Sequence, residues 1–179
     1  MIRWRTSACA VILGLLPAIQ AGTEPEDELK SAIVLNFIRY AEWPRLAAGA
    51  PLIVGVVGRP SLEQALQRTL EGKSVSDHPV RVIEIKGPPD GVVCQAIYIA
   101  SDKDAEIKQE LQQPYAAHAL TIGETKNFLD LGGSVNLLLI DGHMSFEVSL
   151  EALTRSGVNI SSRLLRFGQI RGRGKGGAS

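Results

Sequence analysis

The side chains with the most versatile chemistry in this sequence are three histidines and Cys94. His78, His118 and His143 form no His-X-His or His-X-X-X-His pair. His118 and His143 lie near the expected starts of strands and could meet in space. A structural zinc ion takes four ligands, however, and Cys94 is the only cysteine outside the N-terminal segment. We therefore expect no metal site and no cofactor.

Cys94 also raises the hypothesis of a thiol nucleophile with a histidine base. It directly precedes a short apolar run that is typical of a buried strand, which favours a packed structural cysteine instead. The Gly-X-Ser-X-Gly motif of serine hydrolases is absent. No pair among the many carboxylates stands out for glycoside chemistry. A hydrolase that uses Cys94 stays as one alternative.

Gly55, Gly58 and Ser61 occupy the place where a dinucleotide-binding fold has its phosphate loop. The full Gly-X-Gly-X-X-Gly pattern is missing, and Pro60 stands in the turn. The segment therefore predicts an ordinary strand-to-helix turn. Crevices at this end of such a sheet often hold small ligands, which leaves open a ligand site near Gly58 and Gly123.

Three aromatic residues, Phe37, Tyr40 and Trp43, follow one another at a spacing of three. That spacing places them along one side of a helix. They could pack onto a core, or they could form part of a protein interface, because Tyr and Trp are favoured interface anchors.

The composition is that of an ordinary globular protein, with 45% hydrophobic, 21% charged and 5% aromatic residues among 179. Nineteen basic and nineteen acidic residues balance, so the formal charge is zero. Nucleic-acid binding depends on phosphate neutralisation, and a balanced charge argues against it as the main activity. After the N-terminal segment, no apolar run reaches the roughly 18 residues of a membrane span.

The first 21 residues resemble a secretory signal peptide. Arg3 and Arg5 precede an apolar stretch over 8–16, and Ala21 offers a small residue for cleavage. An uncleaved anchor is the alternative. We predict three parts: a signal peptide over 1–21, one α/β domain over 22–170, and a disordered tail rich in glycine and basic residues over 171–179. Cleavage removes Cys9, so the mature chain cannot form an internal disulfide.

The elements that must position these residues alternate between helix and strand. Leu29, Ile33, Phe37 and Tyr40 form the apolar stripe of the first helix, and Asp141-Gly142 is a strong hairpin turn signal. We expect helices over 24–43, 60–70, 101–113, 149–156 and 161–166, a single helical turn over 126–131, and strands over 52–57, 80–85, 96–100, 119–122, 135–140 and 144–148. This order predicts a three-layer α/β sandwich with a mostly parallel sheet and an antiparallel edge hairpin.

Five motifs, in order along the mature chain, resemble the YfiR-like family. They are Leu29-Lys30, Asn36-Phe37 and Tyr40-Ala41-Glu42-Trp43-Pro44; Cys94-Gln95-Ala96-Ile97-Tyr98-Ile99; Leu120-Thr121-Ile122-Gly123 with Phe128 and Gly132-Gly133; Phe146-Glu147-Val148-Ser149; and Gly157-Val158 with Ile160-Ser161-Ser162-Arg163-Leu164-Leu165. The family tends to have Asn in place of Ser149. Its type member also carries cysteines near the late strand pair, where this chain has none.

The resemblance implies a periplasmic regulator rather than an enzyme. Such a protein would bind the periplasmic sensor domain of an inner-membrane diguanylate cyclase, lower cyclic di-GMP signalling and so limit biofilm formation. The resemblance also implies a homodimer. Our candidate partner contacts are Tyr40, Trp43, Arg163 and Arg166. The alternative is a periplasmic small-ligand receptor without a cyclase partner.

Overall fold

The computed structural model describes residues 24–87 and 91–171, so the predicted signal peptide lies outside the described residues. The helices are α1 (Glu24–Tyr40), α2 (Pro60–Leu70), α3 (Asp104–Leu111), α4 (Leu150–Ser156) and α5 (Ser162–Leu165), with a 3-10 turn η1 (Pro114–Ala116). The strands are β1 (Ala41–Glu42), β2 (Leu52–Val57), β3 (Ser74–Val75), β4 (His78–Ile85), β5 (Ala96–Ile99), β6 (Leu120–Gly123), β7 (Val135–Ile140), β8 (His143–Ser149), β9 (Asn159–Ile160) and β10 (Gln169–Arg171).

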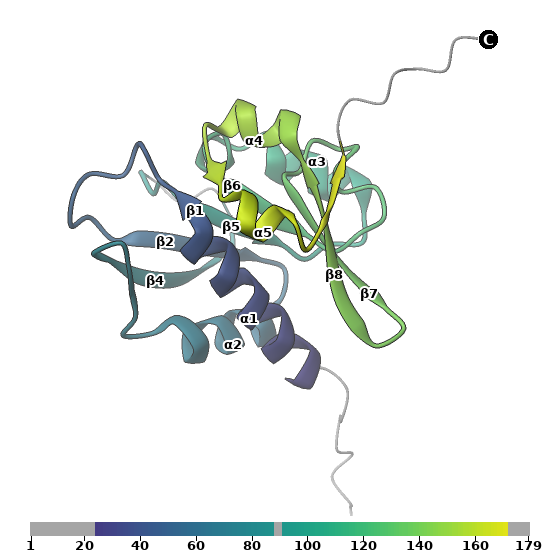
Figure 1. Cartoon of the computed structure of the whole chain (residues 1–179), viewed down its shortest axis with the longest axis horizontal. Helices are drawn as coiled ribbons and strands as arrows, with labels where there is room; N and C mark the ends of the chain where they lie inside the picture. The colour runs from purple at the N-terminus through teal and green to yellow at the C-terminus, as the bar shows by residue number, and fades with distance from the viewer. Residues whose placement is uncertain (1–23, 88–90, 172–179) are drawn as a thin grey trace, which may run out of the picture.

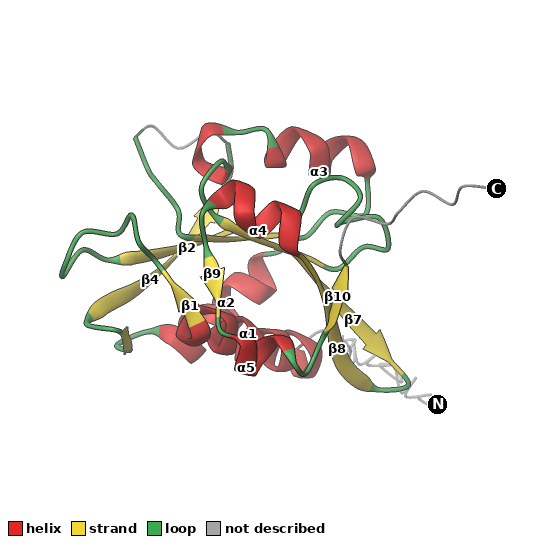
Figure 2. Cartoon of the chain, turned by 45° about the horizontal axis from the view of Figure 1, so that its top comes forward, coloured by secondary structure: helices red, strands yellow, loops and turns green. Residues whose placement is uncertain are grey.

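Eight of these strands form one sheet in the order β10-β8-β7-β6-β5-β2-β4-β3. The run from β4 to β7 is parallel, β8 pairs antiparallel with β7, and β10 runs parallel to β8 at the edge. In Figure 2, α1, α2 and α5 cover one face of the sheet, and α3 and α4 cover the other. The predicted three-layer α/β sandwich with a mostly parallel sheet is confirmed.

The chain adds strands to the sheet in opposite directions on either side of its middle. From β2 the chain passes through α2 to β4 on one side, and from β5 it passes through α3 to β6 on the other. The point of reversal therefore lies between β2 and β5, where the carboxyl ends of the two strands leave a crevice between diverging connections.

The first helix ends at Tyr40, three residues earlier than predicted. Ala41 and Glu42 form the strand β1 instead, which pairs antiparallel with Ile160 and Asn159 of β9. The prediction was wrong here because the pairing partner lies more than 100 residues away along the chain. Figure 1 shows the result: α5 lies beside the end of α1, although the two are far apart in sequence.

The buried face of α1 also differs from the predicted stripe. Val34, Phe37 and Ile38 are fully buried against the sheet, whereas Leu29 and Tyr40 are 42% and 44% exposed. Near the N-terminal end, the buried positions are instead the charged residues Asp27 and Lys30. The helix therefore buries apolar groups at one end and charged groups at the other.

Two glycine positions hold the turn between β6 and β7 in place. A Cβ atom on Gly123 would lie 2.2 Å from the Phe128 ring, and one on Gly133 would lie 2.1 Å from the same ring. The fully buried ring thus lies between two stretches of bare backbone. The single helical turn expected over 126–131 is present as one backbone hydrogen bond from the Leu131 N–H to the Asn127 carbonyl oxygen at 2.9 Å, and it ends at Gly132 with a φ of 108°.

The C-terminal strand was also missed. Arg171, which the sequence places at the start of a disordered tail, ends β10, and its guanidinium contacts Glu147 and Asp130 at 3.3 and 3.4 Å. The remaining tail residues lie outside the described part of the chain. Within residues 24–87 and 91–171, no helix has both the length and the apolar character needed to cross a membrane.

Candidate functional site

An apolar groove of about 460 Å³ lies between α1, β8 and α5. Tyr40 of α1 is 44% exposed, and Phe167, just after α5, is 79% exposed, the highest value among the large hydrophobic side chains described. The groove is lined by Ile33, Asn36, Tyr40, Met144, Phe146, Arg163, Leu164 and Phe167. Exposed aromatic groups around a concave apolar surface are typical of a protein-binding site.

The short ladder between β1 and β9 brings the two sides of this groove together. Next to it, the Ser161 N–H donates to the Tyr40 carbonyl oxygen at 2.8 Å. The Ser161 hydroxyl then caps α5 by accepting from the Arg163 N–H at 3.3 Å. The backbone thus fixes Tyr40 and Arg163 as neighbours across the groove.

The floor of the groove is closely packed. The Phe146 ring packs edge-on against Phe37, with ring centroids 4.9 Å apart and an interplanar angle of 76°. The ring also lies against Gly168, where a Cβ atom would approach it to 2.0 Å. A partner would therefore meet a preformed apolar surface.

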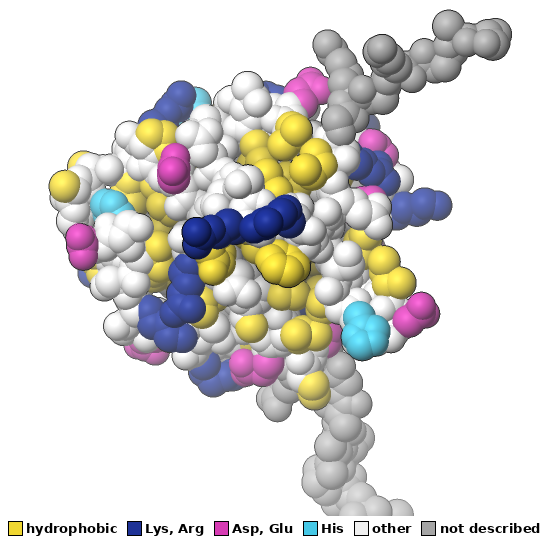
Figure 3. All heavy atoms as spheres, in the orientation of Figure 1, with side chains coloured by type: hydrophobic (Ala, Val, Ile, Leu, Met, Phe, Trp, Pro, Cys, Tyr) yellow, Lys and Arg dark blue, Asp and Glu magenta, His cyan; other side chains and the backbone are white. Residues whose placement is uncertain are grey.

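The charged side chain in the groove lining is Arg163, and two further arginines lie next to lining residues along the chain, Arg39 beside Tyr40 and Arg166 beside Phe167. Arg39, Arg163 and Arg166 are exposed, and none of them takes part in an ion pair among the described residues. In Figure 3, Lys or Arg side chains cross the region of α5 with hydrophobic side chains beside them. This arrangement favours a partner that combines apolar side chains with carboxylates.

The four predicted contact residues do not all lie at this groove. Tyr40 and Arg163 line it together, and Arg166 is exposed at the end of α5 without lining it. Trp43 lies apart: it is half-buried, packs against the core and lines a separate cavity of about 90 Å³. The sequence analysis missed Met144 and Phe167, which also line the groove. For Phe167, the available signal was an aromatic residue directly after a short predicted helix that contains two arginines.

Cys94 does not have the properties of a nucleophile. The side chain is almost fully buried, and burial raises the pKa of its thiol to about 11. The reactive form of a cysteine is the thiolate, which this environment disfavours. His118 lines the same small cavity, but no hydrogen bond joins it to Cys94 among the described contacts. Burial also leaves little sulfur surface for a disulfide with a second chain.

The histidines are not gathered into a metal site. Nδ1 of His78 forms a hydrogen bond with the Ala50 carbonyl oxygen at 2.9 Å. His143 lies at the tip of the β7–β8 hairpin. Among residues 24–87 and 91–171, no three His, Cys, Asp or Glu side chains are close enough to hold a metal ion. The groove is thus the site with the clearest chemical character for a macromolecular partner.

A family model described as YfiR/HmsC-like matches residues 27–169, which run from the first turn of α1 to the first residue of β10. Members of this family are periplasmic regulators in diguanylate cyclase signalling rather than enzymes. Because the match covers well over half of the sequence, the chain belongs to the YfiR/HmsC-like family.

Proposed function

We propose that this protein represses an inner-membrane diguanylate cyclase by binding the cyclase's periplasmic sensor domain. Repression lowers cyclic di-GMP and with it biofilm formation. The observation that carries the proposal is the groove, in which exposed Tyr40 and Phe167 lie beside Arg163. Family membership supports the class of partner.

Repression of this kind acts through differential affinity. A regulator that binds the inactive arrangement of the sensor domain more tightly than the active one shifts the population toward the inactive state. A signal that weakens the contact releases the cyclase. No chemical step at the regulator is required, in keeping with a protonated, buried Cys94.

The contacts divide by type. Tyr40 and Phe167 present aromatic surface that a partner's apolar side chains cover, and Arg163 pairs with a carboxylate at the edge of that contact. Arg166 adds positive charge outside the groove and acts mainly on the rate of association. Trp43 faces a different cavity, so we assign it no direct contact.

Isothermal titration calorimetry with residues 22–179 and the periplasmic domain of a diguanylate cyclase encoded beside this protein's gene tests the proposal. We expect a dissociation constant near micromolar or tighter, which is about −8 kcal/mol. The Arg163→Glu variant should weaken binding at least about tenfold, because it places like charge against the partner's carboxylates.

Arg81→Glu is the matched control, since Arg81 is an exposed arginine on β4, far across the sheet from β8. If the two reversals weakened binding equally, the groove would not be the contact. Undetectable binding by the unmodified chain would argue against a cyclase partner. Sedimentation of the same protein alone tests the predicted homodimer.

A small-ligand receptor is the second candidate function. A crevice of about 840 Å³ at the reversal point of the sheet favours it. A receptor without a partner would show ligand-dependent stabilisation while binding no cyclase domain.

A further inference from the structure

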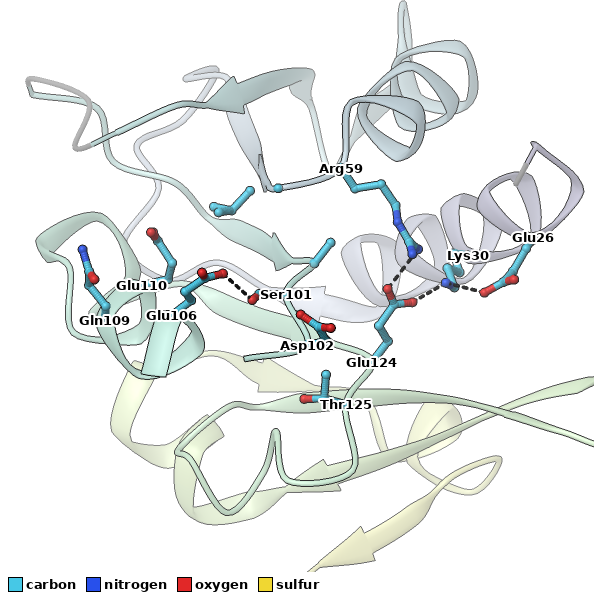
Figure 4. Close-up of a pocket in the computed structure, with 13 residues that line it drawn as sticks. Glu26, Lys30, Arg59, Ser101, Asp102, Glu106, Gln109, Glu110, Glu124 and Thr125 are labelled. Carbon is cyan, nitrogen blue, oxygen red and sulfur yellow. Dashed lines mark hydrogen bonds and ion pairs between the residues drawn. The ribbon is translucent and has the colours of Figure 1, made fainter. Parts of the chain in front are cut away.

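A second cavity, larger than the groove, lies where the strand order reverses. It measures about 840 Å³, within the usual size range of small-molecule sites, and opens at the carboxyl ends of β2, β5 and β6. Its lining includes Gly58 and Arg59 after β2, Ala100 to Asp102 after β5, and Glu124 after β6. Figure 4 shows that α3 supplies one side and the start of α1 the other.

The two cations of the crevice are already neutralised within the protein. The Lys30 ammonium, in a residue only 3% exposed, contacts Glu26 at 2.5 Å and also Glu124. Nη1 of Arg59 lies 2.9 Å from Glu124 and 3.4 Å from Asp27. The hydroxyl of the fully buried Tyr98 donates a hydrogen bond to Glu124 at 3.1 Å. Because both cations are already paired with carboxylates, this side of the crevice offers no unpaired positive charge to an anion.

Carboxylates on the opposite wall are less well neutralised. Glu106 pairs with Lys103, but Asp102 takes part in no ion pair among the described residues, and Glu110 accepts only from the Tyr115 hydroxyl. Across the whole crevice, five carboxylates face two cations, an excess of three negative charges. In Figure 4, Asp102 lies between the acids of α3 and Glu124. An anionic ligand would be repelled here, and a cation attracted.

One oxygen atom among the lining residues, Oγ1 of Thr125, has no hydrogen-bond partner among the described residues. A hydroxyl oxygen can accept a hydrogen bond from an N–H donor. The carboxylates are too dispersed to chelate a metal, since no cluster of three metal-binding side chains occurs in the described chain.

We propose that this crevice binds a small organic cation that carries a primary amine or a guanidinium group. One cationic end of the ligand pairs with Asp102 and the other with Glu110, which Figure 4 shows apart along the same wall, while the paired wall of Lys30, Arg59 and Glu124 limits the depth to which the ligand enters. This site is separate from the groove, and the proposal does not depend on a cyclase partner.

Calorimetry with residues 22–179 at low ionic strength tests the proposal, with agmatine and putrescine as probes. Succinate and 1,4-butanediol have the same four-carbon spacing as putrescine but carry negative or no charge. We expect saturable binding of the two amines only, with an affinity that falls as salt is added.

The double variant Asp102→Asn/Glu110→Gln should raise the dissociation constant at least about tenfold, because charge-assisted hydrogen bonds are lost. Glu151→Gln is the matched control: Glu151 is an exposed carboxylate on α4, and its change should leave binding unaltered. Equal binding of succinate, absence of amine binding at millimolar concentration, or an unchanged affinity in the double variant would each overturn the proposal.

Discussion

The groove and the crevice share one helix but differ in how their charges are arranged. At the groove, α1 contributes Ile33, Asn36 and Tyr40, and the nearby arginines have no partner among the described residues. At the crevice, the same helix contributes Glu26 and Lys30, whose charges are paired. Unpaired exposed charge favours recognition of a partner, whereas paired buried charge holds a shape. The following predictions test this division, from the largest expected effect to the smallest.

Phe37→Ala should produce the largest loss of stability. Phe37 is fully buried and supports Phe146 from beneath the groove. Removing a buried aromatic ring leaves a cavity and lowers the free energy of unfolding by about 3–5 kcal/mol. Urea denaturation measures the change. Tyr40→Ala is the comparison, and if it cost as much, the groove rim would belong to the core.

Lys30→Met should destabilise the protein by about 2–3 kcal/mol, because it leaves Glu124 without its buried cation while keeping the apolar stem of the side chain. Urea denaturation again gives the value. The double variant Lys30→Met/Glu124→Gln should recover part of the loss. If the double variant were as unstable as the sum of both single changes, the two groups would not form a coupled pair.

Phe167→Ala should separate binding from stability. The side chain is 79% exposed, so the free energy of unfolding should change by less than about 0.5 kcal/mol. Binding to the cyclase domain should weaken about tenfold, which corresponds to about 1.4 kcal/mol. Val93→Ala, an exposed apolar change outside the groove, serves as the control. A comparable loss of affinity in both variants would mean that Phe167 makes no specific contact.

The smallest effect concerns pH at the crevice. The hydrogen bond and charge of Lys30 hold the pKa of Glu26 below its usual value of 4.5. A lowered carboxyl pKa in the folded state contributes stability above the unfolded pKa, and that stability is lost as the pH falls through the folded pKa. Glu26→Gln should therefore flatten the decline in stability below pH 4.5. An unchanged acid profile would show that the pairing with Lys30 contributes nothing in solution.

Local signals in the sequence predicted much of the fold correctly. Asp141 and Gly142 adopt positive φ angles of 49° and 77°, as the hairpin signal required. Ser149 caps α4 by accepting from the Ala152 N–H, and Gly157 ends that helix at a φ of 77°. These features depend on residues within a few positions of one another, which sequence patterns represent directly.

The candidate site was predicted only in part, because it depends on distant pairings. Nothing near Tyr40 indicates that Ala41 will pair with Ile160, although this pairing brings Arg163 to the groove. A charged residue in a helix is normally assigned to the solvent side, so the burial of Lys30 could not be predicted without Glu124, 94 positions later. Because the helix turns Lys30 toward the interior at this end, Leu29 is left exposed to solvent.

The Phe128 ring between Gly123 and Gly133 has a consequence for the crevice. Glu124, which contacts both cations there, directly follows Gly123, and so its backbone is anchored by a contact that allows no side chain at two positions. A molecule that enters the crevice thus meets a carboxylate whose conformational entropy was already lost when the chain folded, not at the moment of binding. Substitutions at positions 123, 128 and 133 therefore depend on one another, because a side chain at either glycine fits only if the ring at position 128 becomes smaller.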